Sequence, residues 1–395
     1  MAVCGAGATR EVKEVLREAV VVSLPALLLC LFLDFFAGAF LGKFYEKIRL
    51  EYPIILVILP GLMGLRGNIF GALASRFATM LHLGEMTPTL RDENVTKNIL
   101  ISLLLSLLPV TILWLVGVLK VGNANVAVAV FLIVSASTIF ASLIIGYSTA
   151  LATLIPFRKG ADPDAVAAPL VTTIGDLVTV PLLVAFMILY ERSTGFFGGL
   201  FLAGLALVLL LWRHSRIGRD DIRTFFEVMG VVAILALVSS ITGSLLQSYS
   251  DVIGATVIFS VMYIPILAAT GNFGSIIGAK TSTRLHLGEI EGLFNRDVLL
   301  EISVYTLLAG LIGLLANVIA IGVVRSALKE TVGLVSKFLI FYPLLVFGVM
   351  WMAYFMALWF ERLGLDPDNA TVPAITTLAD VFSTLFIILV ARSMV

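Results

Sequence analysis

The stretch Pro169-Leu-Val-Thr-Thr-Ile-Gly-Asp176 places a carboxylate inside a run of apolar residues. The pattern returns as Pro373-Ala-Ile-Thr-Thr-Leu-Ala-Asp380, 204 positions further along the chain. A charged side chain near the centre of a bilayer costs about 3 kcal/mol or more, so it is expected to face a bundle interior or water. Two such stretches in one chain predict a duplicated membrane protein with a polar interior.

The composition supports a membrane environment. The chain has 395 residues, of which 60% are hydrophobic and 13% are charged, and its mean hydropathy is +1.08. Soluble domains carry about a quarter of charged residues. The 26 basic and 26 acidic residues cancel, which leaves no basic surface for nucleic acid. Two cysteines, Cys4 and Cys30, are too few for a disulfide framework or a cysteine-based zinc site.

Apolar runs of about 20 residues, long enough to cross a bilayer as helices, recur along the chain. The sequence predicts an all-α integral membrane protein with about 11 spans. The expected segments are 18–41, 53–81, 97–119, 125–156, 165–190, 195–212, 224–248, 252–285, 298–324, 332–360 and 368–391.

An internal repeat organises these segments. Three further motifs return 204 positions later, namely Gly67-Asn68 as Gly271-Asn272, His82-Leu-Gly-Glu85 as His286-Leu-Gly-Glu289, and Asp162-Pro-Asp164 as Asp366-Pro-Asp368. One register held over more than a hundred residues indicates a tandem duplication. We expect a first five-helix repeat at 1–194, a linker helix with a basic loop at 195–223, and a second five-helix repeat at 224–395.

The linker decides the expected topology. If the apolar run 196–212 spans the membrane, both repeats share one orientation and are related by a pseudo-two-fold axis along the membrane normal. The basic residues after this run are typical of a cytoplasmic anchor. We therefore expect a multi-pass protein of the plasma membrane with a cytoplasmic N-terminus and an outside C-terminus.

Each repeat presents an oxygen-rich helix face. Residues three and four positions apart lie on the same side of a helix, so two threonines and one aspartate share a face in each copy. Oxygen ligands suit hard cations. The candidate residues are Thr172, Thr173 and Asp176 in the first copy, and Thr376, Thr377 and Asp380 in the second. A threonine-lined helix contact around a protonated aspartate is the structural alternative.

The Gly-Asn motifs supply a second set of candidates. We expect the segment 53–81 to be interrupted, because it carries Pro60 and several glycines. Asn68 and its counterpart Asn272 would then add amide oxygens to each site. At the segment ends, Asp162 is expected to cap a helix N-terminus, and Gly84 and Gly288 are expected to cap helix C-termini.

These motifs, together with the stretch from Pro60 to Arg76, make the chain resemble the MgtE-type magnesium transport domain. It is more similar to the tandem form of that domain, the solute carrier 41 family, over nearly its whole length. The resemblance implies a pore for Mg²⁺, as the transported ion, between the two five-helix units. It also implies that Asp176 and Asp380 line this pore. Since the bacterial members are homodimers, a tandem chain is expected to work as a monomer.

Mg²⁺ gives up its water shell reluctantly. We therefore expect the paired aspartates, threonine oxygens and backbone carbonyls to bind the waters of a hydrated ion. An intramembrane aspartyl protease also uses two aspartates. In that alternative, Asp176 and Asp380 would share a proton. A membrane scaffold without transport is a third alternative. The expected partners are a divalent cation and membrane lipid, and we expect a transporter or channel, not an enzyme.

Overall fold

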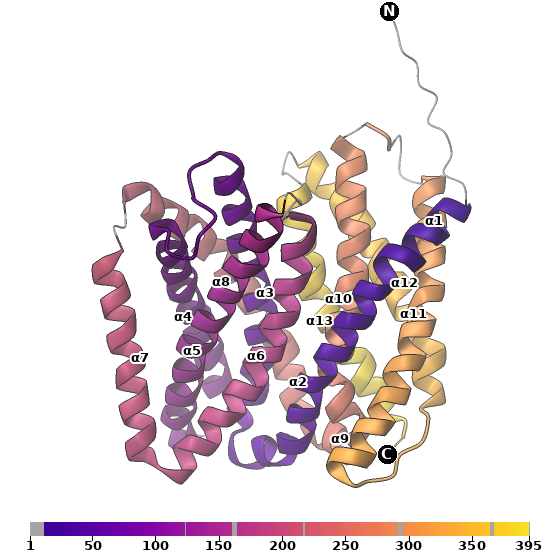
Figure 1. Cartoon of the computed structure of the whole chain (residues 1–395). Coiled ribbons are helices and arrows are strands. Elements are labelled where there is room, and N and C mark those ends of the chain that lie inside the picture. Colours follow the sequence, from indigo (N-terminus) through magenta and orange to yellow (C-terminus); the bar gives the residue numbers. More distant parts are fainter. Residues whose placement is uncertain are drawn as a thin grey trace, which may run out of the picture. The chain divides into compact units, whose positions relative to one another are not determined.

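The computed structural model consists of helices, and no strand occurs in its described residues, which are 12–122, 124–159, 164–215, 218–286, 288–290, 295–363 and 367–394. The chain forms two compact units (Figure 1). Residues 43–250 form one unit, which we call the 43–250 unit. Residues 1–42 and 251–395 together form the other, which we call the terminal unit.

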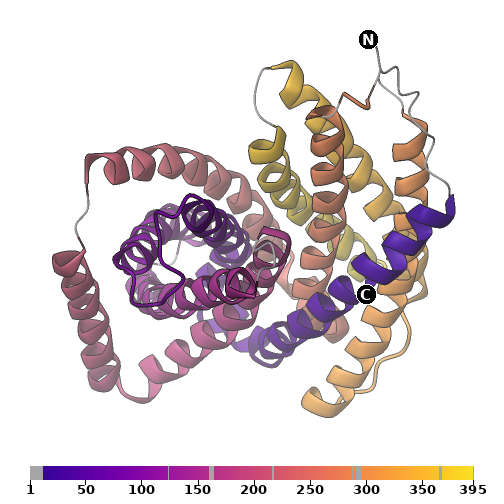
Figure 2. The same cartoon turned by 45° about the horizontal axis from the view of Figure 1, so that its top comes forward.

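The 43–250 unit is an antiparallel helix bundle. It contains the end of α2 (Leu24–Glu51), and then α3 (Pro53–His82), α4 (Glu93–Val121), α5 (Ala124–Arg158), α6 (Asp164–Arg192), α7 (Thr194–His214) and α8 (Arg219–Ser248). Helix α3 packs against α4, α5, α6 and α8 and is mostly buried. Helix α7 lies at the edge of this unit (Figure 2), and its apolar residues are mostly exposed, as suits a lipid-facing helix.

The terminal unit is built in the same way. It contains α1 (Val12–Glu18), η1 (Ala19–Ser23), most of α2, α9 (Ser250–Ala255), α10 (Val257–His286), α11 (Arg296–Val323), η2 (Val324–Leu328), α12 (Ser336–Arg362) and α13 (Pro367–Arg392). Helix α10 takes the place that α3 has in the other unit, packing against α11, α12 and α13. Helix α1 lies at one end of this unit, and α13 ends at the opposite end (Figure 1).

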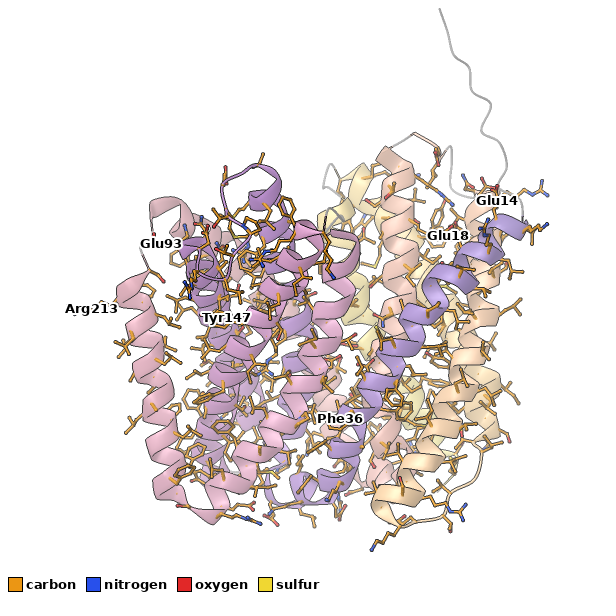
Figure 3. All side chains as sticks on the ribbon, viewed as in Figure 1. Glu14, Glu18, Phe36, Glu93, Tyr147 and Arg213 are labelled. Atoms are coloured by element: carbon orange, nitrogen blue, oxygen red, sulfur yellow. The ribbon has the colours of Figure 1, made fainter. Side chains whose placement is uncertain are left out.

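The prediction of about 11 membrane spans is confirmed. In the described part of the chain, 11 helices are long and apolar enough to cross a bilayer, and each coincides with one of the expected segments. The linker run forms α7, whose candidate span is Thr194–Arg213. Exposed apolar side chains such as Phe36 on α2 point outward from the helices (Figure 3).

The first helix of each repeat packs against the core of the other repeat. Gly38 on α2 lies against the backbone of Val261 on α10, with no room for a Cβ atom. Gly243 on α8 lies in the same way against the backbone of Val57 on α3. Val57 and Val261 are themselves 204 positions apart. The two contacts are therefore equivalent, and they explain why the compact units cross the expected boundaries of the repeats.

The expected interruption of segment 53–81 is wrong. Helix α3 runs without a break from Pro53 to His82, with Pro60 inside it, and α10 likewise contains Pro265. A proline inside a helix removes one backbone hydrogen bond, and neighbouring membrane helices can hold such a helix together. Here Leu113 of α4 covers Gly61, and residues 54–59 are fully buried. The glycines serve close packing and do not break the helix.

The glycine caps are confirmed. Gly84 and Gly288 have φ angles of +72° and +69°, in the left-handed region that glycine adopts without strain. Beyond each glycine, the next amide donates back into the helix, from Glu85 to Met80 and from Glu289 to Arg284, at 2.9 Å in both cases. The expected cap Asp162 and its repeat counterpart Asp366 lie outside the described residues.

Candidate functional site

In the 43–250 unit, the Gly-Asn motif and the Thr-Thr-x-x-Asp motif come together where α3 crosses α6. Gly67 faces Thr172 so closely that a Cβ atom at position 67 would lie 3.2 Å from the Thr172 methyl carbon. Asp176 lies one turn further along α6 and is partly exposed, as are Thr172 and Asn68, whereas Thr173 is buried. The structure thus gathers all four expected residues of the first repeat at one helix crossing.

The terminal unit repeats this arrangement at the crossing of α10 and α13. Gly271 faces Thr376, and a Cβ atom at position 271 would lie 3.7 Å from the Thr376 methyl carbon. Asp380 and Asn272 are partly exposed, as Thr376 is, and Thr377 is buried. The expected residues of the second repeat are therefore also brought together, with the same pattern of exposure as in the first repeat.

The two threonines of the second repeat donate their hydroxyl protons to their own helix. The Thr376 hydroxyl donates to the carbonyls of Val372 and Pro373 at 3.0 Å, and the Thr377 hydroxyl donates to Pro373 at 2.9 Å. A hydroxyl that donates keeps oxygen lone pairs that can accept from a water molecule. Such oxygens suit a hydrated cation, whose waters present hydrogens to the protein.

Arg66 is a functional candidate that the sequence analysis passed over. It precedes Gly67 on α3 and is only 3% exposed. Its guanidinium donates to the Thr138 hydroxyl on α5 at 3.2 Å and to the Thr179 hydroxyl on α6, and it interacts electrostatically with Asp176. Its Nε has no hydrogen-bond partner. The available signal was a fixed charge inside an apolar segment, which calls for a counter-charge.

A second set of buried charges occurs in the terminal unit. Glu301 on α11 is 1% exposed and accepts from Arg284 on α10 at 2.6 Å. The ammonium of Lys280 lies 3.7 Å from the same Glu301 oxygen and 2.9 Å from an oxygen of Glu18, at the end of α1 (Figure 3). These ion pairs connect the N-terminal helix to α10 and α11, away from the helix crossing that carries Asp380.

The described residues contain no cluster of three or more His, Cys, Asp or Glu side chains that could hold a metal ion.

A model of the MgtE family, described as a divalent cation transporter, matches residues 59–186 and again residues 263–390. Together the two matches cover more than half of the chain, and they are offset by the same 204 positions as the repeated motifs. The chain belongs to the MgtE family. This is a family of membrane transporters and not of enzymes, so the comparisons give no support to the aspartyl protease alternative.

Similar curated proteins are members of the solute carrier 41 family. Solute carrier family 41 member 2 of Homo sapiens is 25% identical over 361 residues, which cover 84% of this chain and 62% of the relative. Solute carrier family 41 member 3 of Mus musculus is 24% identical over 385 residues, covering 88% of this chain and 77% of the relative. The chain thus spans less than two thirds of the length of the member 2 relatives. No solved structure matches it significantly.

Proposed function

We propose that the chain carries Mg²⁺ across the plasma membrane along two aspartate faces, one from each repeat. The observation that carries this proposal is the repeated helix crossing. In both units a glycine lies against a threonine, and an aspartate one turn further along stays partly exposed within an apolar span. A carboxylate inside a membrane span is costly and is therefore a functional-site candidate by default.

The donor set favours an ion that keeps its waters. Each face offers one carboxylate, threonine oxygens and the side chain of Asn68 or Asn272. Mg²⁺ binds proteins through one or two carboxylates and retains several waters. The carboxylate would accept hydrogen bonds from these waters, which are stronger when the acceptor is charged. Inward movement would be driven by the membrane potential, at about 4.6 kcal/mol per divalent ion for each 100 mV.

The fold also supports a chain that works as a monomer. Each compact unit includes the first helix of the other repeat, so neither repeat completes its own unit. The two repeats in one chain would replace the two subunits of a homodimer, related by a pseudo-two-fold axis along the membrane normal. With 11 spans, the N-terminus would face the cytoplasm and the C-terminus the outside. Lipid would cover exposed apolar helices such as α7.

Divalent-cation flux into liposomes tests this proposal. The purified chain, reconstituted with a Mg²⁺-sensitive dye inside the vesicles, is expected to give flux that empty vesicles lack. The double variant Asp176→Ala plus Asp380→Ala, shown to be folded by size-exclusion chromatography, is expected to lose this flux. Flux that the double variant leaves unchanged would refute the assignment of the two aspartates. A folded wild-type chain without divalent flux would refute the transport function itself.

A further inference from the structure

Arg66 lies directly behind the Asp176 face. Its Cβ is 4.0 Å from the point where a Cβ atom of residue 175 would lie, so α3 and α6 are in van der Waals contact at this level. From there the guanidinium reaches the hydroxyls of Thr179 and Thr138. Because Thr179 follows Asp176 by three positions, it lies on the same side of α6 as the carboxylate. The guanidinium is thereby held beside the aspartate.

The two charges differ in their access to the surface. Arg66 is almost fully buried, whereas Asp176 is partly exposed. An arginine keeps its charge at any physiological pH, and its electrostatic interaction with Asp176 partly neutralises that carboxylate. A cation that approaches Asp176 therefore meets a carboxylate that already has a fixed positive neighbour, and it must compete with that neighbour.

The second repeat has no charge at this place. Thr270 precedes Gly271 as Arg66 precedes Gly67, and its hydroxyl donates to the carbonyl of Ile266 on its own helix at 2.7 Å. Ser383, which occupies the position of Thr179, has a buried hydroxyl without a hydrogen-bond partner. The hydroxyl that holds the guanidinium in the first repeat thus has a counterpart in the second, but the guanidinium does not.

We propose that Arg66 is a tethered cation that competes with the transported ion for Asp176 and so sets the affinity of the path. This inference rests on the proposed function. A conducting site must bind its ion well enough to admit it and weakly enough to release it. A divalent ion beside two carboxylates would be held tightly, and a fixed guanidinium next to one of them weakens the hold. Arg66 is thus assigned the role of an affinity-determining residue.

Mg²⁺ flux into liposomes as a function of Mg²⁺ concentration tests the inference. For Arg66→Thr, which copies the second repeat, the half-saturating concentration is expected to fall roughly tenfold, since the removed charge lay next to the binding carboxylate. The saturating flux is expected to fall as well, because the ion leaves more slowly. Arg66→Lys keeps the positive charge beside Asp176, and its half-saturating concentration is expected to stay within about threefold of the wild-type value. A merely structural role would lower the flux without lowering the half-saturating concentration.

Arg76→Thr is the matched control, because Arg76 lies on the same helix about 15 Å along its axis from Arg66. It is expected to leave the half-saturating concentration unchanged. Wild-type flux with an unchanged or higher half-saturating concentration in Arg66→Thr would overturn the inference and leave the transport function standing. If Arg66→Thr does not fold, Arg66→Gln takes its place, because its amide can still donate to the hydroxyls of Thr138 or Thr179 without the charge. The half-saturating concentration is again expected to fall, and no decrease would overturn the inference.

Discussion

The two units share their backbone contacts and differ in their polar interiors. The pairs Gly38–Val261 and Gly243–Val57 are equivalent, and so are the crossings of Gly67 with Thr172 and of Gly271 with Thr376. In contrast, Arg66 of the first repeat corresponds to Thr270 in the second. The close contacts specify the fold in both copies, because a glycine at a backbone contact has no substitute of the same size. A buried charge needs a specific partner, and the buried charged residues differ between the two repeats.

The largest expected difference between the two units is in the stability lost when the buried ion pair of the terminal unit and its counterpart are mutated. Counted from the N-caps Asp92 and Asn295, Glu301 of α11 corresponds to Asn98 of α4. Asn98 donates to the Met80 sulfur at 3.8 Å, and Met80 corresponds to Arg284. Glu301→Gln is expected to destabilise the protein by about 3–5 kcal/mol, because Arg284 stays buried without a counter-charge.

Asn98→Leu, its counterpart in the 43–250 unit, is expected to cost about 1 kcal/mol, as no charge is left unpaired. Thermal unfolding in detergent, followed by tryptophan fluorescence, measures both variants against the wild type. Equal losses of stability would contradict the view that the two interiors have diverged in energy as well as in sequence.

The glycine contacts should respond alike in the two units. Gly38→Val and Gly243→Val would each drive a side chain into a backbone carbonyl, on Val261 and on Val57 respectively. Overpacking of this kind costs about 1–3 kcal/mol or more. Gly230→Val is the matched control, since Gly230 lies on the same helix as Gly243 and has no atom within 4 Å of its Cβ position. We expect both contact variants to lose the monodisperse peak in size-exclusion chromatography and the control to keep it.

If only one of the two contact variants is affected, the contact of α2 with α10 and the contact of α8 with α3 are not equivalent.

Separate expression of the two halves of the chain tests the same contacts. Residues 1–215 and 218–395, expressed separately, each lack a helix that the described packing requires, so each half is expected to aggregate alone. Coexpression of the halves is expected to restore a folded complex.

Some features of the fold were predictable from the sequence, and others were not. The spans and the glycine caps Gly84 and Gly288 were predictable, because hydropathy and a left-handed backbone are local properties. The continuous course of α3 through Pro60 was not, because it depends on the helices packed around it. The partners of Gly38 and Gly243 lie more than 180 positions away, so no local pattern identifies these contacts.

The candidate site likewise contains residues that the sequence predicted and one residue that it did not. The faces of Asp176 and Asp380 followed from repetition and helical spacing. The involvement of Arg66 did not, because its significance depends on two other helices, α5 with Thr138 and α6 with Asp176 and Thr179, which surround the guanidinium. The sequence shows that Arg66 is a charge inside an apolar span, but it does not show that α6 supplies the opposite charge.

The smallest expected difference between the two units is in the stability of the helix N-termini of α4 and α11. This difference depends on pH. Asp92 caps α4, whereas the uncharged Asn295 caps α11. Partial burial raises the pKa of Asp92, but hydrogen bonds from Thr87 and Asn94 outweigh this and lower its pKa below the usual value. The stabilisation is therefore present above the unfolded pKa near 4 and is lost as the pH falls through the lower folded pKa.

We expect the first turn of α4 to become more accessible to hydrogen exchange below about pH 4, after correction for the intrinsic exchange rate, by an amount worth about 1 kcal/mol or less. The first turn of α11 and the variant Asp92→Asn are expected to lack this pH dependence. A parallel change in both helices would show that the cap charge is not its source.

The central claim is that each repeat contributes one aspartate to a single Mg²⁺ path. Mg²⁺ flux into liposomes for the single variants Asp176→Asn and Asp380→Asn tests it most directly, with the exposed Glu289→Gln as the control. Each aspartate variant is expected to lower the flux at a sub-saturating Mg²⁺ concentration by roughly tenfold or more, while Glu289→Gln keeps the wild-type flux. Wild-type flux in either folded aspartate variant would contradict the claim, because that repeat would then contribute no carboxylate to the path.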